Sequence, residues 1–339
     1  MAIILAVICG VGLGYIIERG DFCFHSTLRG LVRKPPELDL FRAYLLTLLV
    51  AVPLVQGMRL LGWIDPWIPP FNLQANLLGG TLFGVGMVTA SSCITGLFYK
   101  LGHGMLGALV GLAAWALGDL IAYKGPLAGL REGLTAAPLT VNGGETATVL
   151  NTAGPGGGVV LLLVGTAVLY YLWRSPQHGR GKYWGWLLLG LATGLMVSAA
   201  WLLADIGGTD YPYGTSGVPT EAVEAVLNGG QGSGSLWIPV ALVSLIPGSF
   251  LAAWRAGTLW VRGETPSRYV QLAAGGLMMG IGAGIAGGCN LGHSLVGVPL
   301  LSLGSITSTA AMFLGVALAH GILQAVRRQT AVPQRRTVS

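Results

Sequence analysis

The sequence predicts an all-α polytopic membrane protein of about nine transmembrane helices. We expect two inverted four-helix repeats, with short re-entrant half-helices around a central substrate pathway. Only 9% of the 339 residues are charged, against about 25% in a soluble domain, and the mean hydropathy is +0.69. The apolar runs are continuous, whereas a membrane β-barrel would alternate apolar and polar residues. In addition, a Gly-rich segment that carries a cysteine occurs twice.

Nine apolar segments are candidates to cross a bilayer, for which a helix needs about 20 residues, although the first of them is short. They lie at roughly 2–17, 39–61, 73–90, 104–123, 156–173, 183–204, 236–254, 270–287 and 304–326. The first segment has no basic residue before it and no cleavage-site pattern after it, which favours a span over a signal peptide.

The basic residues predict the orientation of these spans. Lys and Arg gather after the first span, in the 174–182 and 255–268 loops and in the tail, whereas 62–72 and 205–235 contain none. Because basic loops stay in the cytoplasm, we expect an external N-terminus and a cytoplasmic C-terminus in the bacterial inner membrane. The net charge of +6 is therefore a topology signal and does not indicate nucleic-acid binding.

The repeat is visible when residues 79–96 are placed over 275–292. Seven of the eighteen positions are identical, and Cys93 falls on Cys289. Because the span at 156–173 lies between the two copies, the second copy crosses the membrane in the opposite direction to the first. Inverted repeats of this kind are an architecture of transporters. Close packing of helices at small residues is an alternative reason for the shared glycines. The predicted units are 1–125 (first repeat), 126–182 (external loop and linking span), 183–326 (second repeat) and 327–339 (basic cytoplasmic tail).

Three cysteines are predicted to line the substrate pathway. Cys23 stands between two phenylalanines, and Cys93 and Cys289 stand where Gly-rich helices end. The N-terminus of a half-helix offers free N–H groups and a positive dipole, which suit an anion. A thiol adds a weak, polarizable contact that favours a soft substrate. The alternative for each cysteine is a small packing residue, which is our interpretation of Cys9.

Further candidates accompany these cysteines. The candidate pathway-lining residues are His25, Ser92, Gly288, Asn290 and His293. The candidate intramembrane polar residues are Glu18, Arg19 and Asp119. Glu18 and Arg19 also fit a cap at the membrane surface, whereas Asp119 lies within an apolar span and requires a function or a partner. The chain has no C-x-x-C pair and no Cys/His ligand cluster, so we expect no metal, no cofactor and no catalytic residue.

These motifs resemble those of the YeeE/YedE family of bacterial sulfur-transport membrane proteins. The matching elements are Phe22-Cys23, Ser92 to Gly96, Gly288 to His293 and the two-half layout over about 1–325. The resemblance implies thiosulfate uptake, with the ion passed between Cys23, Cys93 and Cys289 by weak S–H···S contacts. It also implies a cytosolic sulfur-carrier partner of the TusA type.

Three alternatives stay open. Another branch of the family is associated with selenium, so a selenium compound or another sulfur species is an alternative substrate. A membrane thiol oxidoreductase would need a resolving cysteine, usually in a C-x-x-C pair. A membrane anchor for a redox complex would transport nothing. The second half has no cysteine in 194–216, where the first motif would place one, so we expect an asymmetric route.

Overall fold

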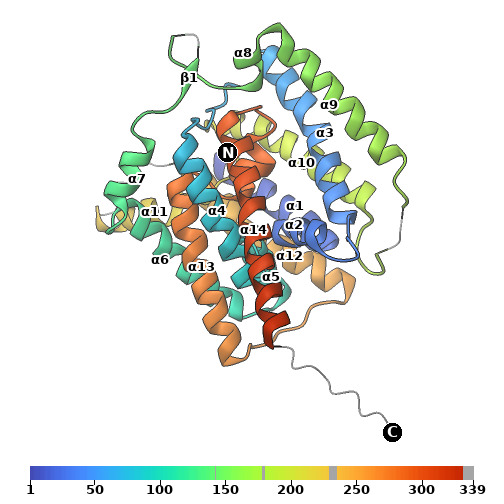
Figure 1. Cartoon of the computed structure of the whole chain (residues 1–339), viewed down its shortest axis with the longest axis vertical. Helices are drawn as coiled ribbons and strands as arrows, with labels where there is room; N and C mark the ends of the chain where they lie inside the picture. Colours follow the sequence, from blue (N-terminus) through green and yellow to red (C-terminus); the bar gives the residue numbers. More distant parts are fainter. Residues whose placement is uncertain (142, 178–179, 229–234, 331–339) are drawn as a thin grey trace.

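The computed structural model describes residues 1–141, 143–177, 180–228 and 235–330, and the regular secondary structure of this part of the chain is almost all helix (Figure 1). Its helices are α1 (Ala2–Gly20), α2 (Phe24–Val32), α3 (Asp39–Leu60), α4 (Leu73–Ala90), α5 (Ile94–His103), α6 (Gly107–Tyr123), α7 (Ala128–Thr135), α8 (Val149–Ala153), α9 (Pro155–Trp173), α10 (Trp186–Ile206), α11 (Val218–Leu227), α12 (Trp237–Ala256), α13 (Pro266–Ala286), the π-helix η1 (Leu291–Gly297) and α14 (Leu303–Thr330). Strands β1 (Thr140–Val141) and β2 (Glu145–Thr146) form a short antiparallel hairpin. Most of the predicted basic tail, 331–339, lies outside the described residues.

The helices confirm the predicted class of polytopic membrane protein. Within the described residues, eight segments are long and apolar enough to cross a bilayer, and α6 becomes the ninth if it is combined with α7, from which it is bent by 65°. All nine coincide with predicted spans. The first and third predicted spans continue past a short break into α2 and α5, which are the two half-helices that follow Cys23 and Cys93.

A close helix crossing joins the two Gly-rich segments, α4 and α13, which lie side by side in Figure 1. A Cβ added at Gly79 would lie 2.5 Å from the backbone nitrogen of Ala286, and one added at Gly275 would lie 2.5 Å from that of Ala90. The two contacts are reciprocal, because the repeat places Gly79 on Gly275 and Ala90 on Ala286. The glycines therefore allow two antiparallel backbones to touch, as small residues do in membranes.

The loops gather at two ends of the bundle. Backbone hydrogen bonds tie 62–72 to 205–217 and to 125–154 at one end, and they tie α1 to 174–185 and 255–265 to the start of α6 at the other. These bonds are Trp67 N to Asp210 O (3.1 Å), Leu139 N to Phe71 O (2.8 Å), Trp184 N to Arg19 O (2.8 Å) and Leu106 N to Arg262 O (3.1 Å). We call the first the acidic end and the second the basic end, after the charges of their loops.

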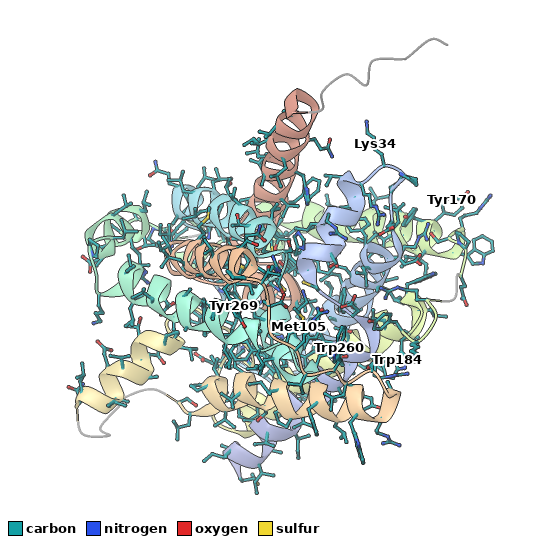
Figure 2. The ribbon with its side chains drawn as sticks, turned by 90° about the horizontal axis from the view of Figure 1, so that it is seen from below. Lys34, Met105, Tyr170, Trp184, Trp260 and Tyr269 are labelled. Carbon is teal, nitrogen blue, oxygen red and sulfur yellow. The ribbon has the colours of Figure 1, made fainter. Side chains whose placement is uncertain are left out.

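Helix α9 stands apart from the bundle. Only 11% of its most apolar window is buried, and it packs mainly against α3 and α8 (Figure 1). Figure 2 shows Tyr170 on α9 pointing away from the other helices, and 56% of this side chain is exposed. An apolar helix with so much exposed surface fits contact with lipid, which is the expected place of a linking span.

Candidate functional site

The three motif cysteines share one local backbone design. Each follows, by two residues, a left-handed residue that ends a long helix, and each lies at the start of a short helix. The left-handed residues are Asp21 (φ 45°), Ser91 (φ 49°) and Gly287 (φ 78°), and the cysteines after them are Cys23, Cys93 and Cys289. Residues other than glycine are uncommon in this left-handed conformation. Here Tyr99 donates to the Asp21 carboxylate (2.8 Å) and Lys100 donates to the Ser91 carbonyl (3.3 Å), which helps to hold both turns.

At two of the three sites this design aims a backbone amide at the sulfur. The Gly96 amide donates to Cys93 Sγ (3.2 Å), and the Leu291 amide donates to Cys289 Sγ (3.3 Å). The first amides of a helix have no partner within the helix and carry its positive dipole. All three thiols are at most 1% exposed. The structure therefore places buried thiols next to the amides of helix starts, and the reception of an anion there stays a prediction.

The structure brings only two of the three thiols together. Cys23 Sγ and Cys93 Sγ are 3.7 Å apart, and Ser92 Oγ lies 4.0 Å from Cys23 Sγ. Gly96 faces the same point, because a Cβ added there would lie 2.5 Å from Ser92 Oγ and 3.0 Å from Cys23 Sγ. The candidate residue Ser92 thus belongs to this thiol pair, and the space beside the pair has no room for even one methyl group.

Cys289 is separate from this pair. No hydrogen bond joins its thiol to Cys23 or Cys93 in the described residues. The two cysteine segments instead meet through the next residue, since Asn290 Nδ2 donates to Thr95 Oγ1 (3.5 Å). The side-chain oxygen of Asn290, Oδ1, is buried without a hydrogen-bond partner in the described part of the chain, so this side chain keeps one free acceptor between the two segments.

A cavity of about 360 Å³ opens beside the Cys289 loop, at the acidic end. We call it the Tyr211 cavity; its lining includes Tyr211, Trp67, Asp210, Gly288, Gly292 and His293. The Tyr211 hydroxyl donates to the Gly292 carbonyl (2.7 Å). Burial, and secondarily the nearby Cys289, raise the pKa of Tyr211 well above its usual range, so the phenol stays protonated and keeps this bond.

His293 borders this cavity, but both of its ring nitrogens have partners. Nδ1 lies 3.0 Å from Ser305 Oγ and Nε2 lies 3.1 Å from the Ala286 carbonyl. A Cβ added at Gly288 would lie 2.8 Å from His293 Nε2, so this glycine makes room for the ring. His293 therefore helps to hold the Cys289 loop and also borders the Tyr211 cavity, and its place on the pathway stays a prediction.

His25 lies at the opposite end of the site, next to a cavity of about 410 Å³ at the basic end. We call it the His25 cavity; it is lined by His25, Arg29, Val32, Arg33, Val88, Ser91, His320, Leu323 and Gln324. The His25 ring stacks on His320, with ring centres 6.0 Å apart. Two cavities therefore approach the cysteines, one from each end of the bundle.

The charged candidates of α1 do not contact the cysteines. Glu18 is 5% exposed and its carboxylate lies 2.5 Å from His103 Nδ1. The Arg19 guanidinium lies over the Trp184 ring, 6.0 Å from its centre. Both contacts lie at the basic end, where the interpretation of these residues as a surface cap fits better than a place on the pathway.

Asp119 has a structural partner that the sequence did not reveal. Its carboxylate accepts bonds from the Gly217 amide (2.9 Å), from the Thr220 amide (3.3 Å) and from the Thr220 hydroxyl (2.7 Å). These groups belong to the first turn of α11. Asp119 therefore caps the N-terminus of another helix, which is a favourable place for a carboxylate.

Sequence reasoning missed three residues of the site: Thr95, Lys100 and Tyr211. Lys100 Nζ donates to Ser92 Oγ (3.1 Å) and so places a cation next to the thiol pair. A signal for it exists, because a single lysine stands in the apolar segment 94–103, two helical turns after Ser92. Cys9, interpreted from the sequence as a packing residue, is fully buried, and its backbone carbonyl accepts a bond from the Tyr213 hydroxyl (2.9 Å).

Comparison with known proteins places the chain among membrane transporters. The sulphur transport family matches residues 19–318. A thiosulfate transporter TsuA of Spirochaeta thermophila is 30% identical over 320 residues, which cover 91% of this chain and 95% of the relative. A thiosulfate transporter TsuA of Escherichia coli is 26% identical over 329 residues, which cover 93% and 92%. A probable transporter YedE of Salmonella typhimurium is 29% identical over 171 residues, which cover 49% of this chain and 39% of the relative.

Proposed function

Because the chain belongs to the sulphur transport family, we propose that it carries thiosulfate across the bacterial inner membrane into the cytosol. The observation that supports the substrate is the position of thiols at three helix starts, at two of which a backbone amide donates to the sulfur. Helix N-termini bind oxyanions in general. The thiols add a preference for an anion with an exposed soft atom, which thiosulfate has and sulfate lacks.

The proposed route runs from the Tyr211 cavity past Cys289, then past Cys93 and Cys23, to the His25 cavity. The close thiol pair supports a hand-over between Cys23 and Cys93 by weak S–H···S contacts. The hand-over from Cys289 needs a movement, because Asn290 and Thr95 now meet between the two segments. Weak contacts at several sites suit transport, since a tightly held ion would not leave.

The proposed orientation places the acidic end outside and the basic end in the cytoplasm, with an external N-terminus. The support is the separation of basic and acidic loops between the two ends. We also propose that 1–125 and 183–326 form inverted repeats, linked by 126–182. The reciprocal Gly79–Ala286 and Gly275–Ala90 contacts are those that a two-fold axis in the membrane plane requires.

A partner follows from the direction of transport. An ion that arrives at the basic end enters the cytosol, where a small sulfur-carrier protein of the TusA type is the expected acceptor. The resemblance of the motifs supports this partner, and exposed arginines of the His25 cavity, such as Arg29, are positioned to meet an acidic surface.

One observation favours a second candidate function, a membrane thiol oxidoreductase. The lack of a C-x-x-C pair argued against it, but Cys23 and Cys93 lie as close in space as such a pair would. A dithiol of this kind can give two electrons and two protons to an acceptor and form a disulfide. The relatives with transporter names make transport the first choice.

The deciding experiment uses proteoliposomes and thiosulfate with a different isotopic label on each of its two sulfur atoms. Transport delivers both labels to the lumen in a 1:1 ratio and leaves all four cysteines free for alkylation. An oxidoreductase would separate the labels or leave Cys23 and Cys93 as a disulfide. The Cys9→Ala variant serves as the matched control, since it removes a thiol outside the proposed route.

Competition tests the role of sulfur in selectivity. Three thiol contacts of about 0.5 kcal/mol each would favour thiosulfate over sulfate roughly tenfold. The Cys289→Ser variant keeps a donor but removes the soft atom, so this ratio should fall more than total anion uptake does. Equal inhibition of wild-type uptake by sulfate and by unlabelled thiosulfate would contradict the idea that the cysteines select for sulfur. Selenite belongs in the same assay, as the probe for the selenium alternative.

A further inference from the structure

His25 is a buried polar side chain that has no hydrogen bond. The residue is 2% exposed, and neither Nδ1 nor Nε2 has a partner among the described residues. A buried polar group left without a partner destabilises a protein by about 1–3 kcal/mol, so such groups are rare in native structures. The fold therefore keeps this imidazole unsatisfied, although it satisfies both nitrogens of His293.

The His25 ring borders a space that can hold a ligand. The His25 cavity measures about 410 Å³, and a water molecule occupies about 30 Å³ of liquid, so a small oxyanion fits together with several waters. Ser91 and Arg29 line the same cavity and are exposed, whereas His25 is buried. The cavity thus leads from solvent at the basic end to the unpartnered imidazole.

The charges around His25 favour an anion. Lys100, Arg29 and Arg268 act on its ring through their charges, together with the neighbouring His320, and the first three are cations. Lys100 also connects the cavity to the thiol pair, since its Nζ donates both to the Ser91 carbonyl and to Ser92 Oγ. Ser92 Oγ in turn lies 4.0 Å from Cys23 Sγ.

We propose that the His25 cavity is a second binding site for the transported sulfur oxyanion, in which the His25 imidazole donates an N–H to the ion after it has passed the Cys23–Cys93 pair. This inference rests on the proposed function, because it takes thiosulfate as the ligand. A neutral imidazole has one N–H donor, and the cations nearby attract the ion without enclosing it. The site would hold the ion away from the thiols and reduce its return.

The test measures binding at the cavity without relying on transport. A Gln324→Cys reporter is introduced at the lining and labelled with a water-soluble maleimide in inside-out vesicles. The four native cysteines are buried and serve as a low background. Thiosulfate should protect the reporter in a concentration-dependent way. A second reporter, Val261→Cys, lies in a loop at the same end and is 65% exposed, so it should not be protected.

Variants of His25 then identify the donor. His25→Leu should raise the half-protecting thiosulfate concentration at least about tenfold, because it removes the buried donor that borders the cavity. His25→Gln retains an N–H donor and should raise that concentration by less than about threefold. If the leucine variant is not recovered from membranes, Arg29→Gln replaces it, and the loss of an exposed cation should raise the concentration a few-fold.

Three outcomes would overturn the inference: no protection of the Gln324→Cys reporter, equal protection at Val261→Cys, or an unchanged half-protecting concentration in the His25→Leu protein. Where that protein is not recovered, an unchanged concentration in the Arg29→Gln protein takes the place of the third outcome. Failure of the proposed function has a different signature. In that case wild-type proteoliposomes take up no labelled thiosulfate, whatever happens at the reporter. Protection by sulfate at the same concentrations would assign the site to oxyanions in general.

Discussion

Replacement of Gly96 by alanine tests whether the thiol pair lies on the route of the ion. The new Cβ would lie 2.5 Å from Ser92 Oγ, 3.0 Å from Cys23 Sγ and 3.3 Å from Cys93 Sγ. These distances are shorter than ordinary contacts, so the neighbours must move apart or the methyl group must displace them. Overpacking of this kind costs about 1–3 kcal/mol, of which alanine recovers up to about 1 kcal/mol through its better helix propensity. The protein should therefore still fold and reach the membrane.

Transport should be affected more than folding. The ion has to part the same groups that the methyl group now crowds, and each 1.4 kcal/mol added to its barrier slows passage tenfold. We expect the initial rate of thiosulfate uptake into proteoliposomes to fall by roughly 10- to 100-fold at equal protein content. The measurement is labelled uptake at saturating thiosulfate, normalised to the purified protein in the vesicles.

Two other glycines supply the comparison. Gly292 occupies the position of Gly96 in the second copy of the motif, but a Cβ there would lie 3.6 Å from the nearest atom, the Tyr213 carbonyl oxygen, so Gly292→Ala should slow uptake by no more than a few-fold. Gly57 in α3 has nothing within 4 Å of an added Cβ, and Gly57→Ala controls for the change of helix propensity. The reasoning is refuted if the Gly96→Ala protein transports at the wild-type rate.

Two further predictions concern the architecture. Asp119→Asn should lower the melting temperature of the detergent-solubilised protein by a few degrees. The asparagine amide would present N–H groups to the donors of Gly217 and Thr220, so the cap of α11 would lose about 1 kcal/mol. An unchanged melting temperature would show that the cap contributes nothing to stability. An impermeant maleimide should label the Val223→Cys protein from outside and the Val261→Cys protein from the cytoplasm. Both positions are exposed, Val223 to 40% and Val261 to 65%. Labelling of both from one side of the membrane would contradict the proposed orientation.

The positions of the helices could be predicted from the sequence because hydropathy is a local property. The nine predicted spans coincide with α1, α3, α4, α6, α9, α10, α12, α13 and α14. The boundaries differ where a helix continues through polar residues: α1 extends to Gly20, although the predicted span ends at 17. A helix in lipid satisfies its own backbone hydrogen bonds, so a run of apolar residues is enough to indicate it.

The candidate site was predictable only in part. The sequence singled out Cys23, Cys93 and Cys289 by their motifs, and the structure places each at the start of a short helix. It did not indicate that Cys23 would meet Cys93, 70 residues away, while Cys289 stays separate. The argument from a missing C-x-x-C pair failed for the same reason, because thiols that are distant in the chain can be adjacent in the fold.

The sequence by itself determined the class of protein, the spans and the placement of charge, since each depends on residue type within a short window. Only the tertiary structure decided which partners the polar residues find. Asp119 caps a helix through Gly217, 98 residues later, and both ring nitrogens of His293 have partners, whereas those of His25 have no hydrogen-bond partner among the described residues. Each outcome depends on which helix faces are packed together, and that packing is settled by close contacts between backbones, such as that of Gly79 with Ala286, which local hydropathy does not specify.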